Sequence, residues 1–339
     1  MAGIAGSLMF GLLPIVLVAA VVFALVTARR GTTLEDDLGD APHDDGIGTV
    51  RRLFIYTLAL VGLIIAAVGV SMVIAGALDA ITGRVIFAER RQGLAVALAF
   101  SVVGGPAWLL FAWLTQRSLR DHDVERRSQL RRLYLGLARG VAVAVIATNA
   151  ITAGRMVAGI EGFRGAPWGA LVTWVAVWAV HERLARAEPP PTTVTRLLDR
   201  LTAYFGTLLG LALLLSGAVG VLAAPLSALY DRAFRESMVM GDWSESLRAS
   251  LVVMLVGGAL WSWHWLRDLA QRDRLTTLWL TQVFLFGVLL GVALALVPAA
   301  LAVYATLEWF FGQPAADTAA AHFGDMPSTL ATLAIGLAT

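Results

Sequence analysis

The sequence contains neither cysteine nor lysine among its 339 residues, and only 15% of its residues are charged. The missing cysteines exclude disulfides, thiolate metal sites, iron–sulfur clusters and cysteine nucleophiles. The missing lysines exclude a Schiff base, and with it a retinal protein. The 26 basic residues counted as lysine plus arginine are therefore all arginines.

Acidic residues are also missing from the middle of every predicted membrane helix. Proton-coupled and cation-coupled transporters typically need such carboxylates near the bilayer midplane. The His-Glu-x-x-His, Gly-x-Ser-x-Gly and phosphate-loop motifs of common enzyme classes do not occur either. We therefore expect no catalytic residues, no metal site and no nucleic-acid partner.

Hydrophobic residues, in contrast, make up 58% of the chain, and the mean hydropathy is +0.75. This composition is typical of a polytopic membrane protein. A crossing needs about 20 apolar residues, and eight segments meet that requirement. They lie near residues 4–28, 53–78, 92–115, 133–154, 167–182, 201–228, 249–267 and 275–307.

One pattern recurs four times: an arginine, a leucine, and an apolar run with a small residue 17 positions after the arginine. The copies begin at Arg52, Arg132, Arg200 and Arg274 and reach Gly69, Asn149, Gly217 and Gly291. We interpret each copy as the leading helix of a helical hairpin. Because every copy enters from the arginine side, the hairpins are parallel repeats about an axis along the membrane normal.

The predicted fold is all-α, with an N-terminal anchor helix followed by four tandem transmembrane hairpins, the last one incomplete. The predicted divisions are an anchor at 1–30, an acidic linker at 31–50, and hairpin repeats at 51–128, 129–193, 194–272 and 273–339. The final apolar run starts near Pro327 and covers only about 20 Å of a roughly 30 Å hydrocarbon core. We therefore expect the native chain to continue past Thr339.

The arginines predict the orientation in the membrane. Seventeen of them fall at one set of helix ends and loops and eight at the opposite set, with Arg139 inside a helix. Short cytoplasmic loops carry the excess of positive charge. We expect a multi-pass protein of a bacterial cytoplasmic membrane with its N-terminus outside, its arginine-rich loops cytoplasmic, and the lipid bilayer as its immediate partner.

Four polar residues inside or near the crossings are candidate site residues. His181 and His264 follow Trp178 and Trp261 at the same three-residue spacing, so they are expected at similar depth. They are candidate ligands of a b-type haem or a quinone, or else members of an interfacial aromatic belt. Arg139 and Gln282 occupy nearly equivalent repeat positions and are candidates for lining an inner cavity, although Arg139 could also snorkel to the interface.

The arginine-led hairpins and the Gly-Gly-x-x-Trp returning helix, best preserved at Gly257 to His264, resemble a family of bacterial multi-pass membrane proteins with a repeated domain of unknown function. The resemblance covers residues 51–339. It implies a helical integral membrane domain and no catalytic residues.

The leading hypothesis for function is a non-enzymatic scaffold, sensor or assembly component of the membrane, acting with a membrane protein partner or as a homo-oligomer. The alternatives are a transporter or channel that uses a cavity between the repeats, and a haem- or quinone-binding redox subunit. No cofactor is required by the first two.

Overall fold

The computed structural model describes residues 46–83, 87–121, 128–190, 196–234, 243–269 and 276–339, and these parts of the chain contain helices and short connections without any strand. The longer elements are α2 (Gly46–Ile81), α3 (Phe87–Asp121), α4 (Gln129–Val157), α5 (Gly165–Arg186), α6 (Arg196–Phe234), α7 (Trp243–Ser262), α10 (Leu290–Phe311) and α12 (Met326–Ala338). The π-helix η2 (Trp263–Leu269) continues α7. The short helix α9 (Thr277–Gln282) and the π-helix η3 (Val283–Leu289) lead into α10, and α11 (Ala319–His322) and the 3-10 helix η4 (Phe323–Asp325) lead into α12.

Six of the described helical stretches are long and apolar enough to cross a membrane, namely 50–81, 92–120, 129–157, 202–234, 243–267 and 279–311. They confirm six of the eight predicted crossings. The predicted anchor at 4–28 lies outside the described residues, as does most of the linker at 31–50, whose last five residues belong to α2. The predicted crossing at 167–182 falls in α5, which has 22 residues but is not one of the six stretches that are apolar enough to cross a membrane. Tryptophans and the polar residues at the end of α5 lower its mean hydropathy.

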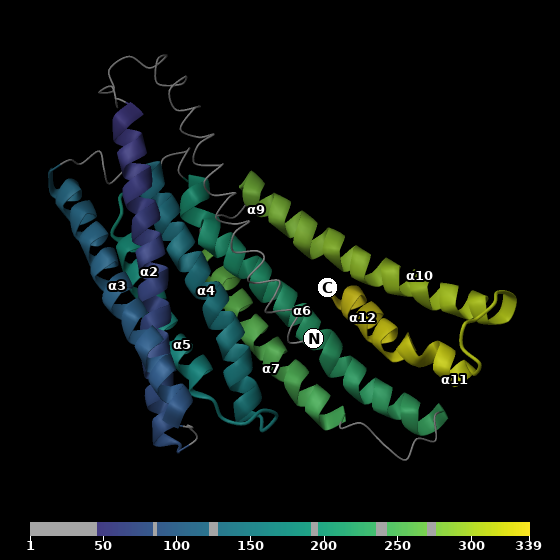
Figure 1. Cartoon of the computed structure of the whole chain (residues 1–339). Coiled ribbons are helices and arrows are strands. Elements are labelled where there is room, and N and C mark those ends of the chain that lie inside the picture. The colour runs from purple at the N-terminus through teal and green to yellow at the C-terminus, as the bar shows by residue number, and fades with distance from the viewer. Residues whose placement is uncertain (1–45, 84–86, 122–127, 191–195, 235–242, 270–275) are drawn as a thin grey trace.

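Helices α2 and α3 lie side by side in antiparallel register (Figure 1). Glycines set their distance: a Cβ added at Gly69 would lie 2.5 Å from the backbone nitrogen of Ser101, and one at Gly104 would lie 2.4 Å from that of Ala66. These values are far below van der Waals contact, so a larger residue at either glycine would push the two backbones apart. The absence of side chains here is what permits the close packing.

Helices α6 and α7 pack in the same manner (Figure 1). A Cβ at Gly217 would lie 2.3 Å from the backbone nitrogen of Met254, and one at Gly257 would lie 2.2 Å from that of Leu214. As in the pair of α2 and α3, each helix contributes a glycine that meets the backbone of the other.

Helix α5 packs against both α2 and α4. It begins at Gly165, whose amide donates to Asp79 Oδ1 at 2.6 Å, so the start of α5 is attached to the end of α2. Farther along, the large ring of Trp174 is 4% exposed and packs against Ala67 of α2 and Ala142 of α4. The tryptophan thus fills the space that these two alanines leave open.

Helix α12 packs against both α6 and α10 (Figure 1), as α5 packs against α2 and α4. A Cβ added at Gly336 would lie 2.5 Å from the carbonyl oxygen of Leu294 on α10. Four residues later α10 contains Pro298, which has no amide hydrogen to donate to that carbonyl. The backbone of α12 therefore covers a carbonyl that lacks its usual bond within the helix.

The first half of the described chain, α2 to α5, meets the second half, α6 to α12, where α4 packs on α6 and α7. The Thr202 hydroxyl donates to the carbonyl of Gly136 at 3.0 Å, and the Arg248 guanidinium donates to the carbonyl of Ala158 at 2.6 Å. These bonds lie toward the two ends of α4. The bond of Thr202 places the start of α6 beside the part of α4 that carries the candidate residue Arg139.

Candidate functional site

A cavity of about 110 Å³ lies among α4, α5, α6 and η2. Polar, charged and aromatic side chains dominate its walls: Arg139, Trp178, Glu182, Arg186, Arg200, Thr202, Trp263 and His264, with Ala185 and Ala203. It therefore contains two of the four candidate residues, Arg139 and His264, which are 125 positions apart in the sequence.

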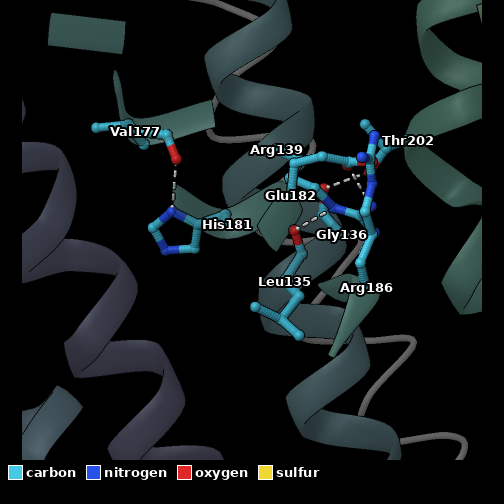
Figure 2. A network of polar contacts seen from close by, with 8 residues as sticks. All are labelled: Leu135, Gly136, Arg139, Val177, His181, Glu182, Arg186 and Thr202. Carbon is cyan, nitrogen blue, oxygen red and sulfur yellow. Dashed lines mark hydrogen bonds and ion pairs between the residues drawn. The ribbon is translucent and has the colours of Figure 1, made fainter. Parts of the chain in front are cut away.

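Arg139 is held by an ion pair with a neighbouring helix. Its Nη1 lies 3.0 Å from Glu182 Oε2 on α5, and its Nε donates to the carbonyl of Leu135 at 3.1 Å. The other oxygen of Glu182 accepts from Arg186 Nε at 3.0 Å, so one carboxylate joins two guanidinium groups (Figure 2). Arg139 is only 8% exposed. Because a lone buried charge is costly, the carboxylate is what makes this burial acceptable.

His264 forms part of the same cavity from η2. It is 5% exposed, and its Nδ1 lies 2.9 Å from the carbonyl oxygen of Leu260. The ring lies against the backbone of α6, where a Cβ at Gly206 would approach it to 2.6 Å. The glycine in α6 is therefore what allows an imidazole at this position.

His181 lies outside this cavity and points away from Arg139 and Glu182 (Figure 2). Its Nδ1 is 2.8 Å from the carbonyl oxygen of Val177. Because a carbonyl oxygen can only accept a hydrogen bond, Nδ1 carries a proton and donates it. Its Nε2, 3.0 Å from the Tyr134 hydroxyl, is then the acceptor. That hydroxyl in turn accepts from Trp108 Nε1 at 3.4 Å. Both ring nitrogens of His181 are thus engaged in a chain of hydrogen bonds that links α3, α4 and α5.

Gln282 is 7% exposed at the junction of α9 and η3, and it is not among the residues that line the cavity around Arg139. Its amide oxygen is buried and has no hydrogen-bond partner among the residues that the structure describes. The structure thus brings Arg139 and His264 together, while His181 and Gln282 lie in separate environments.

Sequence reasoning missed Glu182, Arg186 and Thr202. Glu182 lies in the last turns of α5, where an acidic residue is expected to be solvated. One local signal was present, since a glutamate four residues before an arginine favours an ion pair on one helix face. The pairing with Arg139, 43 residues away, depends on how α4 and α5 pack.

A family model described as a domain of unknown function (DUF5671) matches residues 52–181 and 200–338, which is most of the chain. No curated protein and no solved structure matches.

Proposed function

From the premise that this chain belongs to the DUF5671 family of domains of unknown function, we propose that it is a non-enzymatic membrane scaffold or assembly component built from two copies of one helical unit. Each copy is a pair of the four predicted hairpins: α2 to α5 in the first, and α6 to α12 in the second. The chain is a multi-pass membrane protein by the length and composition of its helices.

The glycine contacts support the duplication. Gly62 and Gly69 of α2 meet Trp108 and Ser101 of α3, and both the glycines and their partners are seven positions apart. Gly210 and Gly217 of α6 meet Trp261 and Met254 of α7 with the same spacing on both sides. Independent helix pairs would have no reason to share one antiparallel register. The similar places of α5 and α12 within their halves point the same way.

The hydrogen bonds of the polar residues inside the helices carry the scaffold proposal. The Ser71, Ser101 and Thr173 hydroxyls and the Asn149 amide each donate to the carbonyl four residues earlier in their own helix. A transport pathway needs polar groups directed at a common space near mid-depth. In this chain the four side chains instead form hydrogen bonds within their own helices, and the glycines let the helices pack closely around them.

The size and chemistry of the cavity give less support to a redox subunit. A pocket for a drug-sized ligand has a volume of about 300–1,000 Å³, and the cavity that contains His264 has about 110 Å³. His181 uses both ring nitrogens elsewhere. We therefore expect the absorption spectrum of the purified protein to lack a Soret band. A Soret band corresponding to one haem per chain would instead support a haem-binding redox subunit.

Cysteine accessibility tests the scaffold proposal without background labelling, since the chain has no native cysteine. We expect Ser71→Cys and Thr173→Cys to resist a small water-soluble thiol reagent, because both positions are buried. Ala187→Cys, in the exposed turn after α5, serves as the reactive control. Labelling of the two buried positions at the rate of the control would favour a water-filled pathway instead.

Ala187→Cys, together with a new variant, Thr82→Cys, tests the proposed orientation. The turn at Ala187 follows the arginine-bearing end of α5, whereas Thr82 lies in the turn after α2 at the opposite end. An impermeant maleimide should label Thr82→Cys in intact cells and Ala187→Cys only after permeabilisation. The reverse pattern would overturn the cytoplasmic assignment of the arginine-rich ends.

A further inference from the structure

The residues that follow α5, 187–190, form a strap that lies against the start of α4. Two consecutive arginines of α4 hold two consecutive residues of this strap. Arg131 reaches Glu188 Oε1 with its Nε at 2.7 Å and with its Nη2 at 2.5 Å. Arg132 Nη2 donates to the carbonyl of Pro189 at 2.6 Å. The strap is thus bound through a side chain and through its own backbone.

These contacts are buried, although they lie at an end of the helix bundle. Arg131 is 5% exposed, Arg132 is 4% exposed, and the Glu188 side chain is 6% exposed. A buried ion pair keeps its members together, because either charge alone would be left uncompensated. A guanidinium also presents its donors in a fixed plane, so Arg132 meets the Pro189 carbonyl in a defined direction. The strap is therefore held in one place on α4.

The strap is the point at which the chain leaves the first half. Helix α6 begins at Arg196, six positions after Pro190. Thr202 of α6 then donates to the carbonyl of Gly136, four residues along α4 from Arg132. The chain is thus bound to neighbouring turns of α4 on both sides of the passage between the halves. Six residues span at most about 20 Å, so the strap limits how far the start of α6 can move from α4.

The charge of the arginines does not by itself account for these contacts. Arg132 begins the second of the four arginine-led segments, and an arginine near a helix end helps to orient that helix in the membrane. Orientation requires neither burial nor a particular partner, and lysine serves it equally well. The bond to the Pro189 carbonyl depends instead on the length and shape of the arginine side chain.

We propose that Arg131 and Arg132 are positioning residues that fasten the strap to α4 and thereby hold α6 and α7 of the second half against α4. While the strap is bound, the two halves stay together. When the strap is released, α6 and α7 can move away from α4. The inference goes beyond the scaffold proposal and does not depend on it, because a transporter with this fold would have the same contacts.

Proteolysis measures how often the strap is released. A protease needs an extended segment on both sides of its cut, so a site inserted after Pro190 is cut while the strap is open. The cleavage rate of the folded full chain in detergent then follows the open fraction. Loss of a charged hydrogen bond should raise this rate about ten-fold or more in Arg132→Gln and in Glu188→Gln.

Three further variants make this test specific. Arg155→Gln is the matched control, because Arg155 pairs with Glu161 in the turn at the other end of α4. An equal increase in Arg155→Gln would mean general loosening and would overturn the proposal. Arg132→Lys keeps the charge but loses the guanidinium, so it should be cut as fast as Arg132→Gln. Cleavage of Arg132→Lys at the rate of the unmodified protein would mean that only charge matters, which also overturns the proposal. The double variant Arg131→Gln/Glu188→Gln loses the ion pair without leaving a lone charge, and it should be cut faster as well.

A buried cysteine measures whether the halves part when the strap opens. Thr202 is 5% exposed where α6 meets α4, and the chain has no native cysteine. A small thiol reagent should label Thr202→Cys about ten-fold faster when Glu188→Gln is added, in step with cleavage. Glu188→Gln changes no residue of a described helix, so the helices that fold in the unmodified protein are unaltered. Faster cleavage with unchanged labelling of Thr202→Cys would show that the strap opens without freeing α6, and it would overturn the proposal.

Discussion

At the scale of single residues, the chain keeps charge inside its helix bundle by pairing it. Arg139 is two turns inside α4, yet its guanidinium ends at Glu182 rather than in lipid or free solvent. The same carboxylate also holds Arg186. Removing one member of such a pair leaves an uncompensated buried charge, which costs far more than the pair itself contributes.

We therefore predict that Glu182→Gln destabilises the protein by about 3 kcal/mol, the effect of breaking a buried ion pair. The measurement is the free energy of unfolding in detergent, followed by circular dichroism. The double variant Arg139→Gln/Glu182→Gln should recover much of the loss, because no charge is then left unpaired. If the double variant is as unstable as the single one, Glu182 has a role other than compensating Arg139.

The turn between α4 and α5 provides a pH-dependent pair. Arg155 Nε donates to Glu161 at 2.6 Å, and Arg164 also bonds this carboxylate. The hydrogen bond from Arg155 lowers the pKa of Glu161, with Arg164 adding to the effect and partial burial opposing it. A lowered folded-state pKa contributes stability that is present at neutral pH and is lost as the pH falls below the ordinary glutamate value of about 4.3.

Glu161→Gln should accordingly lower the thermal midpoint at pH 7, and the difference from the unmodified protein should shrink as the pH falls through 4. The comparison of the two unfolding midpoints across this range checks the sign. A difference that is constant with pH would mean that the ionised carboxylate of Glu161 contributes nothing.

At the scale of elements, adjacent glycines in one helix have different environments. A Cβ at Gly104 would collide with the backbone of α2, 2.4 Å from the nitrogen of Ala66, whereas one at Gly105 would meet nothing within 4 Å. The pair therefore forms an internal control for the packing of α2 on α3.

We predict that Gly104→Ala destabilises the protein by about 1–3 kcal/mol, the usual cost of overpacking. Gly105→Ala should be neutral or stabilising by up to about 1 kcal/mol, because alanine is the better helix former. Thermal unfolding of the two variants in the same detergent decides the matter. Equal effects would show that α2 and α3 do not approach each other as closely as described.

The sequence contained enough information to locate the helices but not their environments. Runs of about 20 apolar residues predicted six described crossings, because length and hydropathy are local properties. His181 and His264 share a spacing from tryptophan, yet one bonds Tyr134 and the other lines the cavity. Their difference arises from the neighbouring helices, and no local pattern records those contacts.

At the scale of the whole molecule, α4 joins the two halves. Gly154 of α4 faces α7, where a Cβ at that glycine would lie 3.6 Å from Cβ of Val252. Disulfides form between Cβ atoms about 3.5–4.5 Å apart. The absence of native cysteines makes this contact a clean test of how the halves are placed.

The double variant Gly154→Cys/Val252→Cys should form a disulfide under mild oxidation. With a protease site inserted after Pro190, between the halves, the cleaved protein should migrate as one band without reductant and as two bands with it. Gly105→Cys/Val252→Cys is the control, since a Cβ at Gly105 would meet no atom of another helix within 4 Å. Cross-linking no better than in the control would contradict the described junction of α4 with α7.

The contact between Gly336 and the Leu294 carbonyl also bears on the order in which the membrane domain assembles. Synthesis produces α10 before α12, so α10 first enters the bilayer with one carbonyl that Pro298 leaves without a donor. Hydrocarbon supplies no replacement, and the exposed dipole makes α10 less stable as a solitary helix than its hydropathy suggests. Docking of α12 covers that dipole. Packing of α12 on α10 therefore offsets part of the cost that Pro298 imposes on α10 inside a bilayer.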